Sequence, residues 1–273
     1  MKQYYILLIA LVTFSFSQAQ DPIVNIPDAN FKNALINDTV ADFDGDGTYD
    51  GDVDTNNDGE IQVSEAEAVM SLKIPGSVEI NSFVGIEVFV NLQSLIIQEN
   101  DAYSLDISSN TSLVKLHLLD MGDLSSLDVS NNIALVELVC NSTGLIYLNT
   151  SNNVNLEIFN CDDSDLKGLD LSLNTSLTIL SCKGNRLRDL NVKNGNNTSL
   201  TSFNCSDNYY LTCVGVDDIV YAENQTTLGN WSKDANIDYS EDCSLNVIIN
   251  IPDSNFKNML INDVIADFDG DGI

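Results

Sequence analysis

Apolar residues recur through the middle of the chain in a short motif that repeats about every 21 residues. The motif has apolar residues at its first and fourth positions, and an apolar residue or a cysteine at its sixth. Because alternate residues of a strand point to opposite faces, each copy predicts a short strand whose fourth and sixth positions are buried. The first positions of the copies are Val69, Leu92, Leu113, Leu135, Leu156, Leu177 and Leu200.

A second motif, Leu-Asp-x-Ser or a close variant, lies between successive copies of the first. Its copies begin at Leu105, Leu127, Leu148, Leu169 and Leu190. Each repeat therefore carries two short strands, joined by turn-forming serine and asparagine. Units of this length cannot bury a core alone, so neighbouring repeats are predicted to stack into a solenoid.

Over residues 69–211 this pattern resembles the leucine-rich repeat family, most closely the 21-residue variety of secreted bacterial proteins. The resemblance implies a repeat solenoid with one short strand of a parallel β-sheet per turn. It also implies a protein that binds other macromolecules on its strand-lined face and catalyses nothing.

Two residue types recur at one position per repeat, and we expect both to be structural. A buried asparagine can satisfy backbone groups of a turn, and stacked turns lie about 4.8 Å apart. A line of four cysteines at that spacing is too long for one zinc ion, and parallel side chains do not converge into disulfides. The cysteines are therefore predicted to be buried free thiols. The two sets are Asn110, Asn132, Asn153, Asn174 and Asn197, and Cys140, Cys161, Cys182 and Cys205.

The charge of the chain restricts its partners. Its 41 acidic and 11 basic residues give a net charge of −30 and a pI near 4.1. This balance opposes binding to nucleic acid and to anionic lipid. His117 is the single histidine, and no catalytic constellation stands out, so we expect no enzyme.

Residues 1–19 have the features of a signal peptide. Lys2 precedes an apolar run from Tyr4 to Phe16, and small residues stand at Ser17 and Ala19. No later segment approaches the roughly 20 apolar residues of a membrane span. We therefore expect export to the cell surface or the medium, into an oxidising compartment.

Residues 54–65 fit a twelve-residue calcium loop, with oxygen-bearing side chains at positions 1, 3, 5, 9 and 12 and a glycine at position 6. The predicted Ca²⁺ ligands are Asp54, Asn56, Asp58, Gln62 and Glu65, with the backbone carbonyl of Glu60. A second, incomplete loop precedes it, in which Val53 occupies the last position. Its predicted ligands are Asp42, Asp44, Asp46 and Asp50.

Helices are expected on both sides of these loops, within a cap at residues 20–68. Asp28 can cap a helix that buries Phe31 and Leu35, and Ser64 and Glu67 form a candidate capping box. Helix, loop and helix resemble an EF-hand or half of a dockerin. The acidic lead-in also resembles the type 3 repeats of thrombospondins, in which neighbouring calcium ions share carboxylates.

Two cysteines, Cys213 and Cys243, lie outside the repeat frame and predict a disulfide-closed cap at residues 213–246, after a solenoid at 69–212. Beyond it, residues 249–272 are identical to residues 24–47 at 19 of 24 positions. We interpret residues 247–273 as the start of a second calcium cap in a truncated sequence.

The outward side chains of the predicted strands form the candidate ligand face. The expected function is binding of a protein or glycan at the cell surface. The alternatives are a stiff structural stalk and an ancillary region of a larger secreted hydrolase. The candidate ligand residues are Ile96, His117, Val139, Ile158, Asn160, Ile179 and Lys183, four of which suggest an apolar stripe.

Overall fold

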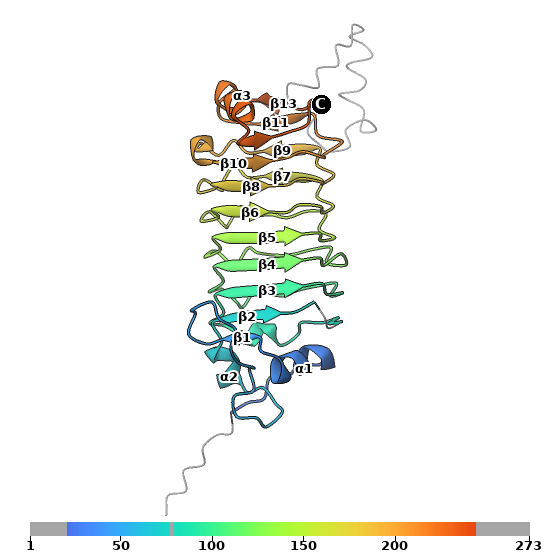
Figure 1. The fold of residues 1–273 in the computed structure, drawn as a ribbon, viewed down its shortest axis with the longest axis vertical. Helices are drawn as coiled ribbons and strands as arrows, with labels where there is room; N and C mark the ends of the chain where they lie inside the picture. Colours follow the sequence, from blue (N-terminus) through green and yellow to red (C-terminus); the bar gives the residue numbers. More distant parts are fainter. Residues whose placement is uncertain (1–20, 77–78, 244–273) are drawn as a thin grey trace, which may run out of the picture.

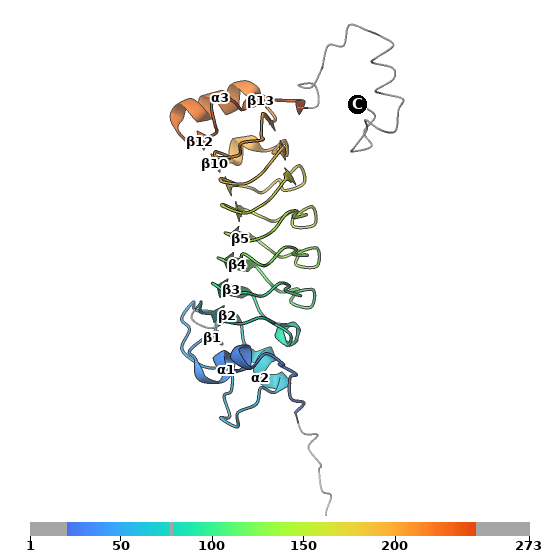
Figure 2. The same ribbon diagram turned by 90° about the vertical axis from the view of Figure 1, so that its right-hand side faces the viewer.

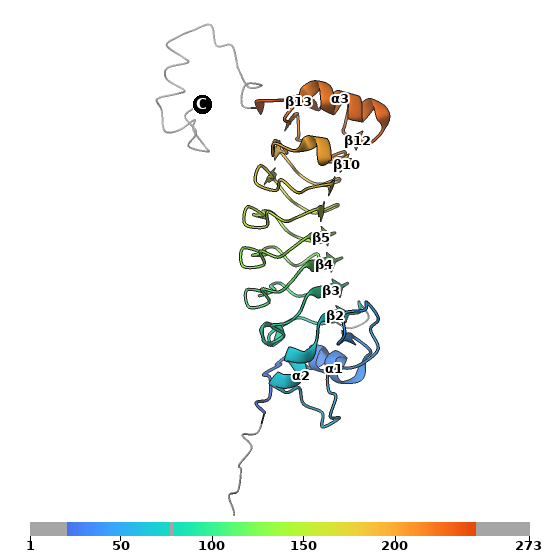
Figure 3. The same cartoon turned by 90° about the vertical axis from the view of Figure 1, so that its left-hand side faces the viewer.

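The protein is elongated. Short strands run across its long axis and stack along it, with a small cap at each end (Figure 1). The computed structural model describes residues 21–76 and 79–243. The predicted signal peptide at 1–19 and the second cap segment at 247–273 lie outside the described residues. Viewed from either side, the main strands line one flank and small turns line the opposite flank (Figures 2 and 3).

The main sheet contains nine strands among the described residues, in the order β1-β2-β3-β4-β5-β6-β8-β10-β12. Every neighbouring pair is parallel except β1 and β2. The predicted solenoid with one parallel strand per repeat is thereby confirmed. The strands are β1 (Ala41–Asp42), β2 (Ser71–Ile74), β3 (Ser94–Gln98), β4 (Lys115–Leu119), β5 (Glu137–Asn141), β6 (Ile158–Asn160), β8 (Ile179–Ser181), β10 (Ser202–Asn204) and β12 (Trp231–Ser232).

The second motif forms a smaller sheet in the C-terminal half of the solenoid. Its order is β13-β11-β9-β7, and its neighbouring strands are parallel. Two of these strands, β11 and β13, belong to the predicted C-terminal cap, so the stacking of strands continues past residue 212. The strands are β7 (Gly168–Asp170), β9 (Asp189–Asn191), β11 (Cys213–Gly215) and β13 (Asp238–Ser240).

The core is one continuous column of leucine, isoleucine, phenylalanine and cysteine side chains. Five-residue strands such as β3 and β4 bury their second and fourth residues and leave the others partly exposed. The four cysteines of the repeat are buried and free, as predicted. Burial raises the pKa of the Cys140 and Cys205 thiols to about 12, which keeps them protonated.

The asparagine ladder is buried as predicted, but it bonds differently. The side-chain amide of Asn132 donates to the carbonyls of Ile107 and Asn110, and that of Asn153 to Val129 and Asn132. The side-chain oxygens of Asn110, Asn132 and Asn153 accept no hydrogen bond from the described residues, so the expected bonds to N–H groups are absent there.

The ladder also shifts by three residues at its C-terminal end. Asn194, rather than Asn197, donates to the Asn174 carbonyl. Asn197 instead bonds within its own turn, to the carbonyl of Val192. The shift follows from the longer spacing of this repeat, which adds residues to the turn before β10.

A second polar ladder follows the main strands and was not predicted. The Asn185 amide donates to the carbonyls of Cys161 and Cys182, and its oxygen accepts from the Leu166 N–H. The residue before each ladder position has positive φ, as at Asp163 and Gly184. The ladder side chains are those of Asn100, Thr143, Ser164, Asn185 and Asn208.

Helical caps cover both ends of the column (Figure 1). At the first end, α1 (Ala29–Asn37) begins at Asp28, whose carboxylate accepts the N–H groups of Asn30 and Phe31, and α2 (Val63–Ala68) follows. At the other end lies α3 (Ile219–Leu228), and Trp231 packs edge-on against Phe203. The Cys213–Cys243 disulfide is formed, as predicted. Single 3₁₀ turns occupy Ile86–Val88 and Asn197–Ser199.

Candidate metal loops and ligand face

The residues predicted to hold calcium in the 54–65 loop converge on its interior. Asp54 is buried, and its two carboxylate oxygens accept the N–H groups of Asp58 and Gly59 at 3.0 and 2.8 Å. Glu65, also buried, accepts from the Thr55 hydroxyl and the Asn56 N–H. Carboxylates from both ends of the loop therefore point inward, which is the arrangement a calcium loop needs.

The remaining predicted ligands close the ring between these two carboxylates. The Gln62 amide nitrogen donates to Asp58 Oδ2 at 2.8 Å, and the Gln62 oxygen accepts from the Asn56 amide at 2.7 Å. Positions 3, 5 and 9 are thus linked by side-chain hydrogen bonds, whereas the carboxylate oxygens of Asp54, Asp58 and Glu65 do not gather within 4.8 Å of one another as those of the acidic loop described below do. The donor set fits a hard divalent cation, which prefers six to eight oxygens.

Two details of this loop differ from the expectation. The helix begins at Val63, after Gln62, and Glu65 accepts the Gln62 N–H at 3.0 Å. The capping box therefore uses Gln62 and Glu65, and the predicted box of Ser64 and Glu67 is wrong. A helix that begins two residues earlier directs Glu65 into the loop.

Glu60 has a partner that the loop pattern did not predict. Its carboxylate forms a 2.6 Å ion pair with Lys32 of α1. This pair ties the middle of the loop to the first helix of the cap.

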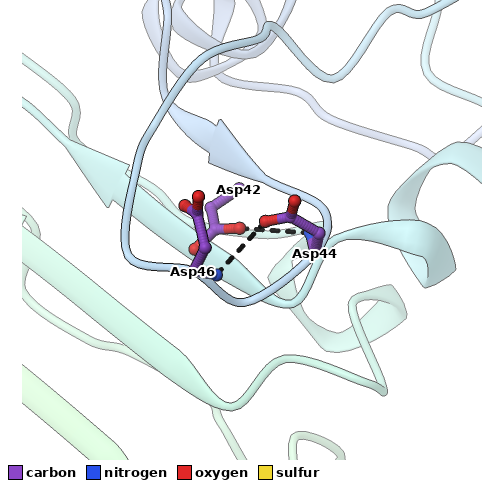
Figure 4. Close-up of side chains that lie close together, drawn as sticks. All are labelled: Asp42, Asp44 and Asp46. Carbon is purple, nitrogen blue, oxygen red and sulfur yellow. Dashed lines mark hydrogen bonds between the residues drawn. The ribbon is translucent and has the colours of Figure 1, made fainter.

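The preceding acidic loop gathers three of its four predicted ligands (Figure 4). One carboxylate oxygen from each of Asp42, Asp44 and Asp46 lies within 4.8 Å of the others. Asp50 is not part of this cluster. The cluster is thus smaller than the predicted ligand set.

Asp42 is the fixed point of this loop. It is fully buried, and it accepts the N–H groups of Asp44, Gly45 and Gly47 at 3.1, 2.7 and 3.0 Å. Burial opposes its ionisation, but these hydrogen bonds together with one from Ser71 hold the pKa of Asp42 below its usual value. The carboxylate is therefore ionised at neutral pH despite its burial.

The acidic loop is joined directly to the main sheet. Asp42 belongs to β1, where it pairs with Ser71 of β2. The N–H of Lys73 also donates to the Val40 carbonyl at 2.9 Å. A change that orders the acidic loop should therefore also order β2, the first parallel strand of the solenoid.

Six of the candidate ligand residues lie on the outward side of the main strands, and the seventh, Lys183, follows the end of β8. These six fall into rows in which each residue stands beside its equivalent in the next strand. One row contains Glu137, Ile158 and Ile179. The neighbouring row runs through Ile96, His117, Val139, Asn160 and Ser181.

The predicted apolar stripe is not continuous. Ile158 and Ile179 are neighbours in one row, whereas Ile96 and Val139 lie in the next row with His117 between them. The repeat frame predicts Ile158 and Ile179 at equivalent outward positions of neighbouring turns, and the pairing of their strands confirms it. The apolar part of the face is thus a compact patch of Val139, Ile158 and Ile179.

A small polar cluster borders this patch. His117 Nε2 lies 2.7 Å from one oxygen of Glu137, and Lys115 Nζ lies 3.4 Å from the other. Burial lowers the pKa of His117, against the opposing hydrogen bond to Glu137. The ring is therefore predominantly neutral at pH 7.

Lys183 lies at the far edge of the face. Its N–H donates to Asp162 Oδ1 at 2.8 Å, and the Ser181 hydroxyl donates to the same oxygen at 2.6 Å. Its ammonium lies 3.6 Å from Asp207. Asp162 thus organises this edge, although sequence reasoning did not single it out.

No family model and no curated protein matches this sequence. Solved structures with a similar fold include internalin C2 of Listeria monocytogenes, with 18% identity, a TM-score of 0.48, and coverage of 85% of this chain and 96% of that chain. The internalin inlF of the same organism has 18% identity and a TM-score of 0.45, and covers 79% and 71%. The functional domain of InlJ from this organism, described as including a cysteine ladder, has 23% identity and a TM-score of 0.27, and covers 59% and 52%.

These similarities concern the fold alone. The repeat solenoid itself is established by the parallel strand pairing of this chain. Within the described residues, no helix is long and apolar enough to cross a membrane.

Proposed function

We propose that this chain is an exported, non-enzymatic leucine-rich repeat protein that binds a protein partner on the outward face of its main sheet. We further propose that Ca²⁺ stabilises its first cap. The observation that carries the binding proposal is the pairing of Ile158 with Ile179, side by side on adjacent strands and pointing away from the core.

The apolar patch has no role in filling the core. Leu180 and Phe159, on the same strands, are buried, whereas the side chain of Ile179 is 39% exposed. Contiguous apolar side chains on a polar surface are typical of the centres of interfaces, where water is excluded on binding. Exposed isoleucine on a strand also suits β propensity, and the double substitution described below separates the two causes.

The surroundings of the patch favour a protein partner. Lys115, His117 and Glu137 form a polar rim that offers both donors and acceptors beside an apolar centre. Interfaces between proteins commonly combine such a centre with such a rim. The main sheet face also carries lysines in a chain whose net charge is −30, so it repels an acidic partner less than the rest of the surface does.

Calcium is proposed for the 54–65 loop and for the acidic cluster of Asp42, Asp44 and Asp46. Convergent carboxylates repel each other, and a bound divalent cation would offset that repulsion. Because the second site adjoins β2, calcium would stabilise the edge of the binding sheet as well as the cap. Extracellular calcium modules typically bind at ~10⁻⁴–10⁻³ M.

The decisive experiment replaces Ile158 and Ile179 with serine. Folding stability should change by about 1 kcal/mol or less, because both sites are at the surface. Capture of a cell-surface or matrix protein partner should fall at least about tenfold, since central apolar anchors commonly contribute about 2 kcal/mol each. Ile133→Ser, on an exposed turn outside the sheet, is the matched control.

A double variant that captures the same partner as well as the original chain would contradict the binding proposal and favour the stalk. If a soluble glycan prevents capture of the partner and soluble protein ligands do not, the face binds a glycan. A large fall in the melting temperature would show that the patch serves folding.

A further inference from the structure

Two hollows meet at Tyr147, one over the second sheet and one over the earlier copies of the second motif. The larger, of about 670 Å³, extends from Tyr147 over Gly168 and Asn191 to Gly215. The smaller, of about 320 Å³, extends from Tyr147 the other way, over Asp128 and Asp106. Together they follow the long axis of the solenoid on a surface different from the candidate ligand face.

A missing side chain opens the larger hollow. Tyr147, Gly168 and Asp189 each precede the leucine of their copy of the second motif, and Gly168 pairs with Asp189 in the sheet. At Gly168 an added Cβ would meet the neighbouring backbone at 3.7 Å, an ordinary contact. The glycine is thus not required by the backbone, and its effect is to leave space beside an exposed tyrosine.

Fixed carboxylates line the same surface. Asp106, Asp128 and Asp170 each follow the leucine of their motif, and each accepts the N–H of the serine two residues later at 2.9–3.0 Å. Hydrogen bonds from the side chain and then the backbone of that serine lower the pKa of Asp106 and Asp128. The carboxylates of Asp106 and Asp128 are therefore ionised, and the serine N–H groups fix the orientation of all three side chains.

The bases of the larger hollow are engaged at its margins. The Arg188 guanidinium lies 5.6 Å from the ring centre of Tyr210, and Lys193 Nζ donates to the Glu241 carbonyl at 3.0 Å. The larger hollow is lined by four acidic residues and these two bases, and the smaller by two acidic residues and no base. The main sheet face, in contrast, presents Lys73, Lys115 and Lys183 among its outward positions.

We propose that this surface binds an extended peptide segment rich in lysine or arginine, with Tyr147 at the centre of the contact. Charge complementarity selects the cationic occupant, and the linear course of the two hollows selects an extended one. A tyrosine ring can also attract a cation, as the Lys167 ammonium 5.9 Å from the Tyr147 ring centre illustrates. The proposal is independent of the partner of the main sheet.

The test uses the full chain and a fluorescein-labelled twelve-residue peptide of alternating lysine and serine, followed by fluorescence anisotropy. Gly168→Trp fills the larger hollow without altering any charge, and it should weaken binding at least tenfold. Gly122→Trp is the matched control, because an added Cβ there meets no atom within 4 Å and Gly122 lines neither hollow. Melting temperatures verify that both variants fold.

A second pair of variants separates the hollows from the general negative field. Asp106→Asn with Asp128→Asn should weaken peptide binding at least fivefold more than Glu67→Gln with Glu223→Gln, which removes the same charge elsewhere. Equal binding by Gly168→Trp and the original chain, or equal losses from the two charge pairs, would overturn the proposal. So would displacement of the peptide by a neutral oligosaccharide, which would assign the surface to a glycan.

Discussion

Asn153 donates its side-chain amide to the backbone carbonyl of Asn132 across 2.8 Å, joining two turns whose asparagines are 21 residues apart. The same amide also donates to the Val129 carbonyl at 3.0 Å. Its oxygen accepts no hydrogen bond from the described residues. The ladder therefore depends on two uncharged donors at one position, which only an amide side chain supplies.

This relationship predicts the effect of removing the donors. Asn153→Leu should lower the free energy of unfolding by roughly 1–3 kcal/mol, because it removes one hydrogen bond from each of two buried carbonyls, which keep only their backbone N–H partners. Asn152, the exposed neighbour that also bonds the preceding turn, provides the control: Asn152→Leu should cost about 1 kcal/mol or less. Urea unfolding of both variants gives the comparison. Equal losses would show that the buried donors contribute nothing beyond the exposed bond.

Calcium should stabilise the protein through both loops. Millimolar Ca²⁺ is expected to raise the melting temperature, since a ligand bound only to the folded state adds about 0.4–1.4 kcal/mol per site at about one to ten times its Kd. Glu65→Gln should abolish binding at the 54–65 loop, and Asp44→Asn should weaken binding at the acidic cluster. Calorimetry of each variant separates the two sites. Asp38→Asn, outside both loops, should behave as the original chain, and an original chain whose melting temperature ignores Ca²⁺ would refute the assignment.

The buried thiols should be inert in the folded protein. At pH 8 iodoacetamide should label none of Cys140, Cys161, Cys182 and Cys205, because burial excludes the reagent and raises their pKa values. In denaturant without reductant it should label these four and leave Cys213 and Cys243 unmodified. Mass spectrometry counts the labels. Six labels in denaturant would disprove the disulfide.

The same pKa shifts predict alkaline sensitivity. A thiol whose pKa is raised by folding favours the folded state fully below its unfolded pKa of about 8.5 and loses that contribution as pH rises. For Cys140 and Cys205 the loss should run from about pH 8.5 to about 12. Replacement of Cys140 by alanine should flatten the fall in stability over this range, whatever its effect at pH 7.

The strands and the buried cysteines could be predicted because one residue type recurs at one position of the repeat. The second polar ladder could not, since Thr143, Ser164 and Asn185 make related bonds with different side chains and leave no repeated residue type. The larger hollow could not be predicted for a similar reason. It opens where Gly168 lacks the side chain that Tyr147 and Asp189 carry at the equivalent position of their repeats.

Lateral contacts were also beyond the sequence pattern. His117 and Glu137 are 20 residues apart, two residues fewer than the local repeat of 22, so they meet diagonally across β4 and β5. The start of α2 depended on a similar local choice, between Gln62 and Ser64 as the capping residue. The repeat frame predicts which face a residue occupies, but not which neighbour it contacts.

His117 allows a direct measurement of the electrostatics of the ligand face, because it is the single histidine of the chain. Its imidazole should titrate below the usual value of 6.5, since burial disfavours the charged ring. Glu137→Gln should lower the pKa of His117 further, because the carboxylate opposes that effect by hydrogen bonding and by charge.

Because the pKa of His117 is lowered by folding, the folded state binds the imidazole proton less tightly than the unfolded state does. The contribution of His117 to stability should be constant above about pH 6.5 and should fall as the pH drops from 6.5 to the folded pKa. Proton NMR of the imidazole follows both chains from pH 4 to 8, with Lys115→Gln as the counterpart that should raise the pKa. An unchanged titration in Glu137→Gln would mean that the 2.7 Å contact is not maintained in solution.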